Sequence, residues 1–303
     1  MLVALFAFVA TLSAADPVKS KSSLKAEKAA ARAQKKKKPA PPDLTKPPLD
    51  SADIKEFPGD TERLDIFLLM GQSNMKGRGV MPAEPLRDPR IVMMSKRTDG
   101  YFLARHPLHL TGSPVDFSGA DNAGVGPGLA FAQALIAAQP KSRILLIPCA
   151  VGGSSLGQWQ KGKRFYEETI RRVRLAVKQG PKGKTRIAGA LWLQGESDSG
   201  TADKIERYPA AIDRLIDDLR ADLGTPELPF IACTIGEIKS DIEARKKINA
   251  ILLELPNQRS HTACVDGRSF AAFLRDNVHF DTPTQQEHGR RFAAKYLELT
   301  ESK

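Results

Sequence analysis

The chain has 303 residues and a formal net charge of +11 at pH 7, because 46 Lys and Arg outnumber 35 Asp and Glu. This length suits one domain with a substantial hydrophobic core, together with terminal extensions. Three cysteines are too few, and of the wrong parity, for a disulfide framework. The composition therefore excludes a small scaffold built on disulfides.

The cysteines and histidines carry no pattern of a metal site. Cys149, Cys233 and Cys264 lie in apolar segments typical of strands, so we expect buried, unreactive thiols. A single disulfide between two of them is the alternative. The five histidines show no helical pairing and have no cysteine nearby, so no metal is predicted.

Residues 1–15 have the pattern of a secretory signal peptide. The run from Leu2 to Leu12 is almost wholly apolar, and the small residues Ser13-Ala14-Ala15 follow it. A run of this length is too short to span a bilayer as a helix, so export to the periplasm or the medium is predicted. No Lys or Arg precedes the run, which leaves a retained anchor or a wrongly assigned start codon as alternatives.

Residues 16–50 form a lysine- and proline-rich segment with little to bury. They hold ten Lys and Arg against four Asp and Glu, which is +6 of the total charge. Such a composition predicts a disordered linker. Its charge would attract an anionic polymer or surface, and a solvated tether without a partner is the alternative. Residues 51–303 contain no recognised nucleic-acid-binding motif, so no specific nucleic acid is expected.

Residues 51–303 are predicted to form one domain in which apolar strands alternate with amphipathic helices. This alternation is typical of a three-layer α/β/α fold whose mostly parallel sheet is covered on both faces. The expected strands are Phe67–Met70, Ile91–Ser95, Arg143–Cys149, Ile187–Leu193, Pro229–Ile235 and Thr262–Val265. The expected helices begin at Gly126 and cover Phe165–Lys178, Ile205–Leu223, Asp241–Leu255 and Thr284–Leu299. The stretch Tyr101–Asp121 reads as irregular because prolines and glycines interrupt it.

Ser73 stands just after the first strand, behind Gly71. A serine in this place lies at the carboxyl edge of a parallel sheet, where ligand crevices form. Its hydroxyl could act as a nucleophile there. The alternative is that Ser73 and Asn74 only cap a helix.

Two further strand ends supply polar groups to the same edge. Gly152-Gly153 can expose backbone N–H groups that would bind an oxyanion. Gln194 could donate a hydrogen bond from its side-chain amide to the same oxyanion. Glu196 and Asp198 are two acids close to this site. Asp198 is better explained as a carboxylate that binds backbone amides. Neither a P-loop nor a GxGxxG motif is present, so a phosphate site is the weaker interpretation.

Asp276 and His279 are spaced so that the carboxylate can accept a hydrogen bond from Nδ1–H of the imidazole. That contact leaves Nε2 free to take a proton from a serine. Asp281 is a rival orienting group. The remaining histidines lack such a carboxylate and are interpreted as structural or surface groups: His106, His109, His261 and His288.

Taken together, these blocks resemble the SGNH hydrolases, and more narrowly carbohydrate esterase family 6 and the sialate O-acetylesterase-like group. The resemblance covers about residues 62–299. It rests on Gly71-Gln72-Ser73-Asn74-Met75, Gly77-Arg78-Gly79, Gly126-Pro127-Gly128, Gly152-Gly153, Trp192-Leu193-Gln194-Gly195-Glu196-Ser197-Asp198 and Asp276-Asn277-Val278-His279-Phe280. Leu193 departs from the pattern, because a histidine often stands there in the group.

The resemblance implies a flavodoxin-like fold and hydrolysis of a sugar ester without a cofactor. It implies that Ser73 is the nucleophile, His279 the base and Asp276 the group that orients it. The oxyanion would be bound by the backbone N–H groups of Ser73 and Gly153 and by the side chain of Gln194. Glu196 is kept as the alternative acid.

The function expected from the sequence is therefore removal of O-acetyl groups from a carbohydrate, either an acetylated xylan-type glycan or an O-acetyl sialic acid. A general short-chain carboxylesterase is the first alternative. The second is an exported glycan-binding protein that keeps the fold without the chemistry. The sequence does not indicate an oligomeric state.

Overall fold

The computed structural model describes residues 53–54, 63–82, 88–96, 98–109 and 123–301. All of them belong to one compact unit, Pro42–Lys303. The predicted signal peptide and linker, residues 1–15 and 16–50, lie outside the described residues. Among the helices that the structure describes, none combines the length and apolarity that crossing a membrane requires.

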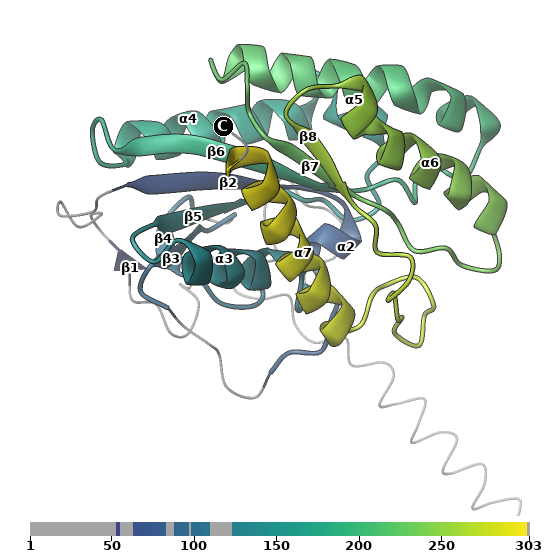
Figure 1. The fold of residues 1–303 in the computed structure, drawn as a ribbon, viewed down its shortest axis with the longest axis horizontal. Helices are drawn as coiled ribbons and strands as arrows, with labels where there is room; N and C mark the ends of the chain where they lie inside the picture. The colour runs from purple at the N-terminus through teal and green to yellow at the C-terminus, as the bar shows by residue number, and fades with distance from the viewer. Residues whose placement is uncertain (1–52, 55–62, 83–87, 97, 110–122, 302–303) are drawn as a thin grey trace, which may run out of the picture. The chain divides into compact units, whose positions relative to one another are not determined.

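The described domain is built on an eight-stranded sheet with the order β1-β4-β3-β5-β2-β6-β7-β8 (Figure 1). The strands from β3 to β8 in this order are all parallel, while β4 and β1 are antiparallel to their neighbours. The bounds are β1 Asp53–Ile54, β2 Leu64–Gly71, β3 Ile91–Met94, β4 Tyr101–Leu103, β5 Arg143–Pro148, β6 Thr185–Leu193, β7 Phe230–Cys233 and β8 Thr262–Val265. The predicted α/β fold with a mostly parallel sheet is confirmed.

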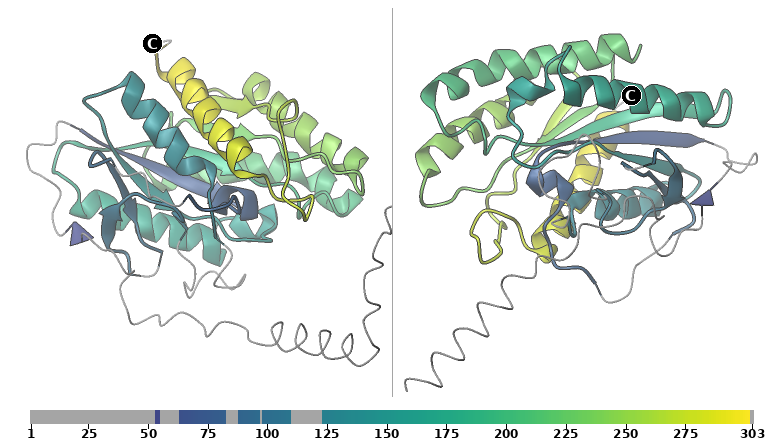
Figure 2. Two further views of the ribbon diagram at one scale, coloured as in Figure 1. Left: turned by 90° about the horizontal axis from the view of Figure 1, so that it is seen from below. Right: turned by 180° about the vertical axis from the view of Figure 1, so that it is seen from behind.

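Helices cover both faces of the sheet. Helices α3 and α7 pack together on one face, and α4, α5 and α6 cover the other (Figures 1 and 2). The helices are α2 Ser73–Lys76, α3 Pro127–Ala138, α4 Arg164–Gln179, α5 Ala202–Asp222, α6 Ile242–Gln258 and α7 Thr282–Glu301, with a 3₁₀ turn, η1, at Leu156–Trp159. The loops after β5, β2 and β6 leave three neighbouring strands at the same edge of the sheet. The segments that carry Gly152-Gly153, Ser73 and Gln194 therefore meet at this edge.

Strand β2 is the centre of the core. All eight of its residues are buried, as expected for a strand covered on both faces. The ring of Phe67 packs edge-to-face on Phe131 of α3 and Tyr296 of α7, with centroids 4.8 and 4.9 Å away. These contacts hold α3 and α7 against the strand that leads to Ser73.

Strand β4 is the main departure from the predicted elements. It forms at the start of the stretch expected to be irregular and pairs antiparallel with β3, joining Val92 to Leu103. Three residues between breakers give no clear local signal, so this segment becomes a strand only because it pairs with β3 and, on its other side, with β1.

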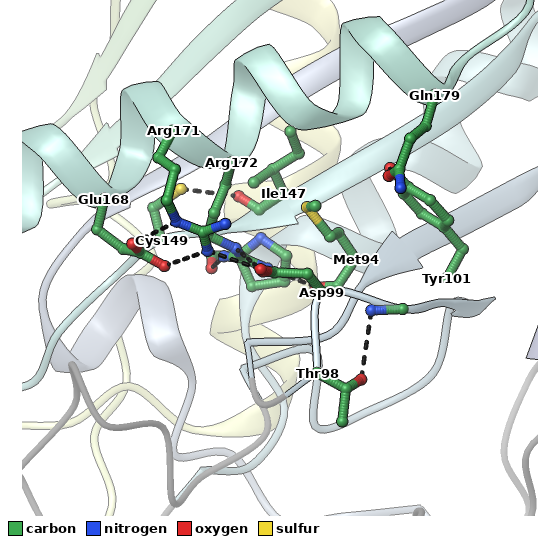
Figure 3. A network of polar contacts seen from close by, with 12 residues as sticks. Met94, Thr98, Asp99, Tyr101, Ile147, Cys149, Glu168, Arg171, Arg172 and Gln179 are labelled. Atoms are coloured by element: carbon green, nitrogen blue, oxygen red, sulfur yellow. Dashed lines mark hydrogen bonds and ion pairs between the residues drawn. The ribbon is translucent and has the colours of Figure 1, made fainter.

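Buried cationic side chains hold the end of β5, from which the Gly152-Gly153 block departs. The guanidinium of Arg172, in α4, is 2% exposed; it donates to the carbonyl oxygens of Pro148 and Met94 and also contacts Asp99 (Figure 3). Lys96 donates through Nζ to the carbonyl of Ala150 at 2.7 Å. These contacts satisfy backbone groups that the sheet leaves unpaired at its edge.

The three cysteines are buried free thiols, which confirms the prediction. Burial raises the pKa of Cys149 and raises that of Cys264 to about 12. Both thiols therefore stay protonated and unreactive near neutral pH.

His288 in α7 is a wholly buried histidine behind the His279 loop. Within the described part of the chain, neither ring nitrogen has a hydrogen-bond partner. The ring packs against Phe270 and Phe280, with centroids 5.0 and 4.6 Å away. Burial lowers the pKa of His288 to about 4. Its imidazole is therefore neutral in the folded protein at ordinary pH.

His288 should make the protein sensitive to acid. Its folded pKa lies below the unfolded value of about 6.5, so the unfolded chain binds the proton more readily. The stability that neutral His288 contributes is complete above about pH 6.5 and is lost as pH falls toward 4, by up to about 3 kcal/mol. We expect His288→Leu to flatten the pH dependence of the unfolding free energy, measured by urea denaturation at pH 7 and 4.5. An unchanged slope would contradict this assignment.

Candidate active site

The turn after β2 places Ser73 at the sheet edge. Gly71 ends the strand with φ +125°, and a Cβ there would lie 2.2 Å from the carbonyl oxygen of Leu193. Only glycine fits this close approach between β2 and β6. The backbone then turns into the short helix α2, which begins at Ser73. The first N–H groups of a helix have no partner within it, so that of Ser73 is available at the edge.

The structure brings together the three side chains of the predicted triad. Oγ of Ser73 lies 2.9 Å from Nε2 of His279. Nδ1 of His279 lies 2.7 Å from Oδ2 of Asp276. Ser73 and His279 are 206 residues apart in the chain, so the contact depends on the whole fold.

Local hydrogen bonds hold the Asp276 carboxylate toward the imidazole. Its Oδ1 accepts from the backbone N–H groups of Val278 and His279 at 2.9 and 3.0 Å. Burial alone would raise the pKa of Asp276, but these N–H groups and the His279 ring bring it down to about 2. The carboxylate therefore remains ionised and can stabilise an imidazolium. The rival, Asp281, instead accepts from the N–H of Thr284 in the first turn of α7.

Gly153 lies in an exposed turn beside the strand that ends at Gly71. The turn is fixed there because the N–H of Val151 donates to the carbonyl of Gly71 at 3.0 Å. Among the described residues, none accepts from the N–H of Gly153. Its carbonyl accepts from Oγ of Ser197 at 3.1 Å, which ties the turn to the loop after β6. The N–H of Gly153 is thus left unused within the described part of the chain.

The side chain of Gln194 lies beneath the site rather than in it. Gln194 is 0% exposed, and its Nε2 donates to the carbonyl of Ser154 at 3.0 Å and to the carboxylate of Asp198. Its Oε1 lies 3.1 Å from the Tyr208 hydroxyl. An amide nitrogen carries two N–H groups, and these two acceptors use both. The structure therefore does not direct this amide toward Ser73, and Gln194 supports the loop that carries Gly153.

Asp198 binds a backbone amide, as predicted from the sequence. Besides Gln194, it accepts from the backbone N–H of Leu156 at 2.8 Å, at the start of η1. It is 5% exposed. Its carboxylate thus binds an amide of the backbone, as expected for an acid at the end of a loop.

Glu196 is close to the site but does not take the place of Asp276. Its Oε1 accepts from Nδ2 of Asn74 at 2.7 Å, and Nδ1 of His279 is already bound to Asp276. Glu196 therefore contacts Asn74 and not the ring of His279. The sequence interpretation missed Asn74, although its position next to Ser73 was the available signal.

No group of three or more His, Cys, Asp or Glu suited to a metal ion occurs within the described part of the chain. The side chains gathered around Ser73 instead form one nucleophile–imidazole–carboxylate series. A hydroxyl, an imidazole and a carboxylate hydrogen-bonded in this order have the geometry of a serine hydrolase site.

Comparison with known proteins identifies the family. The chain belongs to the family described as "Carbohydrate esterase, sialic acid-specific acetylesterase", which matches residues 63–298. It is therefore a carboxylic ester hydrolase of the carbohydrate acetylesterase type. The resemblance inferred from the sequence is confirmed.

Individual relatives agree with this assignment. The chain is 34% identical over 249 residues to a probable carbohydrate esterase of Arabidopsis thaliana, At4g34215, covering 77% of this chain and 90% of that protein. The X-ray structure of that protein superposes with a TM-score of 0.66 at 32% identity, covering 77% and 98% of the two chains. A probable 9-O-acetyl-N-acetylneuraminic acid deacetylase of Escherichia coli (strain K12) is 28% identical over 118 residues, which is 33% of this chain and 35% of that protein.

The crystal structure of NanS shares the fold. It superposes with a TM-score of 0.64 at 18% identity, covering 80% of this chain and 99% of that one. At this identity the likeness concerns the fold alone.

Gly71→Ala should destabilise the protein strongly, since the new methyl group would overlap the Leu193 carbonyl in a backbone conformation that alanine rarely adopts. We expect a loss of at least about 2 kcal/mol in unfolding free energy, measured by urea denaturation. Gly200→Ala is the matched control, because a Cβ there meets nothing within 4 Å; it should change stability by less than about 0.5 kcal/mol. Equal effects of the two substitutions would refute the close-approach argument.

Proposed function

We propose that this esterase removes O-acetyl groups from a carbohydrate through an acetyl-enzyme on Ser73. The observation that supports this most directly is the series of hydrogen bonds from Asp276 through His279 to Ser73, at 2.7 and 2.9 Å. Each group has the contact that its role requires. Asp276 accepts from Nδ1–H, which leaves Nε2 unprotonated and facing the hydroxyl.

In the first step His279 takes the proton of Ser73 as Oγ attacks the acetyl carbonyl carbon. The carbonyl oxygen becomes an oxyanion, and the N–H groups of Ser73 and Gly153 would donate to it. Imidazolium is paired with the ionised Asp276. As the C–O bond breaks, His279 returns the proton to the sugar oxygen, which leaves as an alcohol.

Water then attacks the acetyl group on Ser73 by the same route. His279 removes a proton from the water, the tetrahedral intermediate forms in the same N–H cradle, and acetate leaves as Ser73 regains its proton. In this proposal the backbone N–H groups of Ser73 and Gly153 bind the oxyanion. Gln194 contributes by holding the Ser154 carbonyl and so the turn that presents Gly153.

The substrate class is proposed from the family. The family description names sialic acid, and the Escherichia coli relative is named as a deacetylase of 9-O-acetyl-N-acetylneuraminic acid. We therefore propose an acetylated carbohydrate, either an O-acetyl sialic acid or an acetylated xylan-type glycan.

Acetate release from acetylated xylan and 9-O-acetyl sialic acid, compared with butyrate release from a short ester, tests this function. We expect the wild-type protein to prefer a carbohydrate acetate, and Ser73→Ala to lower kcat at least about 10⁴-fold. A fluorophosphonate should label Ser73. Ser260→Ala, an exposed serine at the opposite end of β8, should retain wild-type activity.

Other outcomes distinguish the alternatives. Turnover of butyrate without any carbohydrate acetate would indicate a general short-chain carboxylesterase. Neither turnover nor labelling would indicate a non-catalytic glycan-binding protein.

We also propose, from the sequence alone, that residues 1–15 direct export and that residues 16–50 tether the domain. The net charge of +6 in the tether would favour contact with an anionic polymer or surface. Expression in a secreting host followed by N-terminal sequencing should find a new terminus near residue 16. Recovery of the chain only inside the cell, still beginning at Met1, would contradict export.

A further inference from the structure

Asn74 touches the backbone on both sides of His279. Its side chain is wholly buried. Nδ2 donates to the carbonyl of Val278 at 3.3 Å, and Oδ1 accepts from the N–H of Phe280 at 3.1 Å. These are the peptide groups just before and just after His279. One rigid amide next to Ser73 therefore fixes the backbone from which the imidazole projects.

Glu196 determines which way the Asn74 amide points. Its Oε1 accepts from the same Nδ2 at 2.7 Å. In the reversed amide, Oδ1 would face both this carboxylate and the carbonyl of Val278, and nothing would accept from Phe280. A carboxylate beside one end of an amide strongly favours the nitrogen there, because hydrogen bonds to an ionised acceptor are the stronger ones.

The surroundings of Glu196 are unusual for a carboxylate without a role. Its Oε2 is buried, and among the residues that the structure describes none forms a hydrogen bond with it. Burial raises the pKa of Glu196, while the hydrogen bond from Asn74 and the nearby cationic groups, Arg245 and His279 when protonated, act in the opposite direction. Tyr208 and Cys233 also lie near, and both are neutral because burial raises the pKa of each. A buried, half-satisfied carboxyl costs stability, so its retention behind the histidine calls for a functional explanation.

Arg245 does not pair directly with Glu196. It donates to Asp241 at 2.8 Å and to the carbonyl of Gly236 at 2.9 Å. The direct partner of Glu196 is therefore Asn74, and through it the His279 loop.

We propose that Asn74 and Glu196 are positioning residues for His279: Asn74 clamps the two flanking peptide groups, and Glu196 fixes the clamp and adds a negative charge behind the imidazole. This inference rests on the proposed function. It assigns neither residue to the reacting atoms. Asp276 orients the ring itself, whereas Asn74 and Glu196 set the place of the backbone that carries the ring.

The test uses Asn74→Ala, Glu196→Ala and Glu196→Gln in the full chain. A displaced base slows the chemical step, so Asn74→Ala and Glu196→Ala should lower kcat about 100-fold with little change in KM. Glu196→Gln keeps a carbonyl oxygen for Nδ2 of Asn74, so it should recover most of kcat. Since it removes a negative charge that acts on His279 together with that of Asp276, the acid limb of kcat/KM should move about one pH unit lower.

Asn249→Ala is the matched control. Asn249 is also a wholly buried asparagine that clamps backbone, binding the N–H and carbonyl of Ile235 at 2.8 and 3.0 Å. It should lower stability without moving the acid limb. If Asn249→Ala reproduces the effects of Asn74→Ala, or if Glu196→Gln behaves like Glu196→Ala with no pH shift, the positioning role is refuted.

Two measurements separate this inference from the proposed function. The rate at which a fluorophosphonate labels Ser73 reports activation by His279 without any sugar substrate. The titration of the His279 ring, followed by NMR, requires no reaction at all. If the wild-type protein releases no acetate, the proposed function fails. The positioning role is then tested by two results: whether Glu196→Gln lowers the His279 pKa, and whether Asn74→Ala slows labelling. If Asn74→Ala does not fold, the titration of His279 in Glu196→Gln decides alone.

Discussion

The hydrogen bond between Ser73 and His279 sets the geometry that the surrounding structure must maintain. It joins the residue after the central strand to the loop before the last helix, 206 residues later. No local preference can maintain a contact over that separation. It is kept because α7 packs on α3, and because Phe67 of β2 contacts both Phe131 and Tyr296, which also contact each other. The apolar core thus fixes the distance between the two ends of the site.

Around this contact, buried polar side chains replace the hydrogen bonds that the sheet no longer supplies at its edge. Asn74 binds the loop of His279, Gln194 the carbonyl of Ser154, and Lys96 that of Ala150. Each is buried, and each satisfies backbone groups that would otherwise be unpaired in a low-dielectric interior. Loops held in this way are rigid, which suits a site whose donors must be in place before charge develops.

Local patterns were sufficient for the fold and for part of the site. Continuous apolar runs identified the parallel strands, and the block Asp276 to His279 is short enough for spacing alone to suggest their contact. The direction of Gln194 was not accessible in this way, because burial under the loop depends on Asp198 and Tyr208. Asn74 was missed for the same reason, since its partners lie more than a hundred residues away. Strand β4, only three residues long, depends on pairing with β3 and β1 on its two sides.

Gly71 and Gly153 have different surroundings, and the lack of a side chain has a different effect at each. At Gly71 a side chain is forbidden by the Leu193 carbonyl, so the absence of a Cβ serves the packing of β2 on β6. At Gly153 a Cβ would meet nothing within 4 Å, although φ is +71°. Among the described residues none accepts from the N–H of Gly153, so this turn is open where the packing around Gly71 is closed. The second glycine therefore leaves the space beside its N–H open, whereas both N–H groups of the Gln194 amide are already used by Ser154 and Asp198.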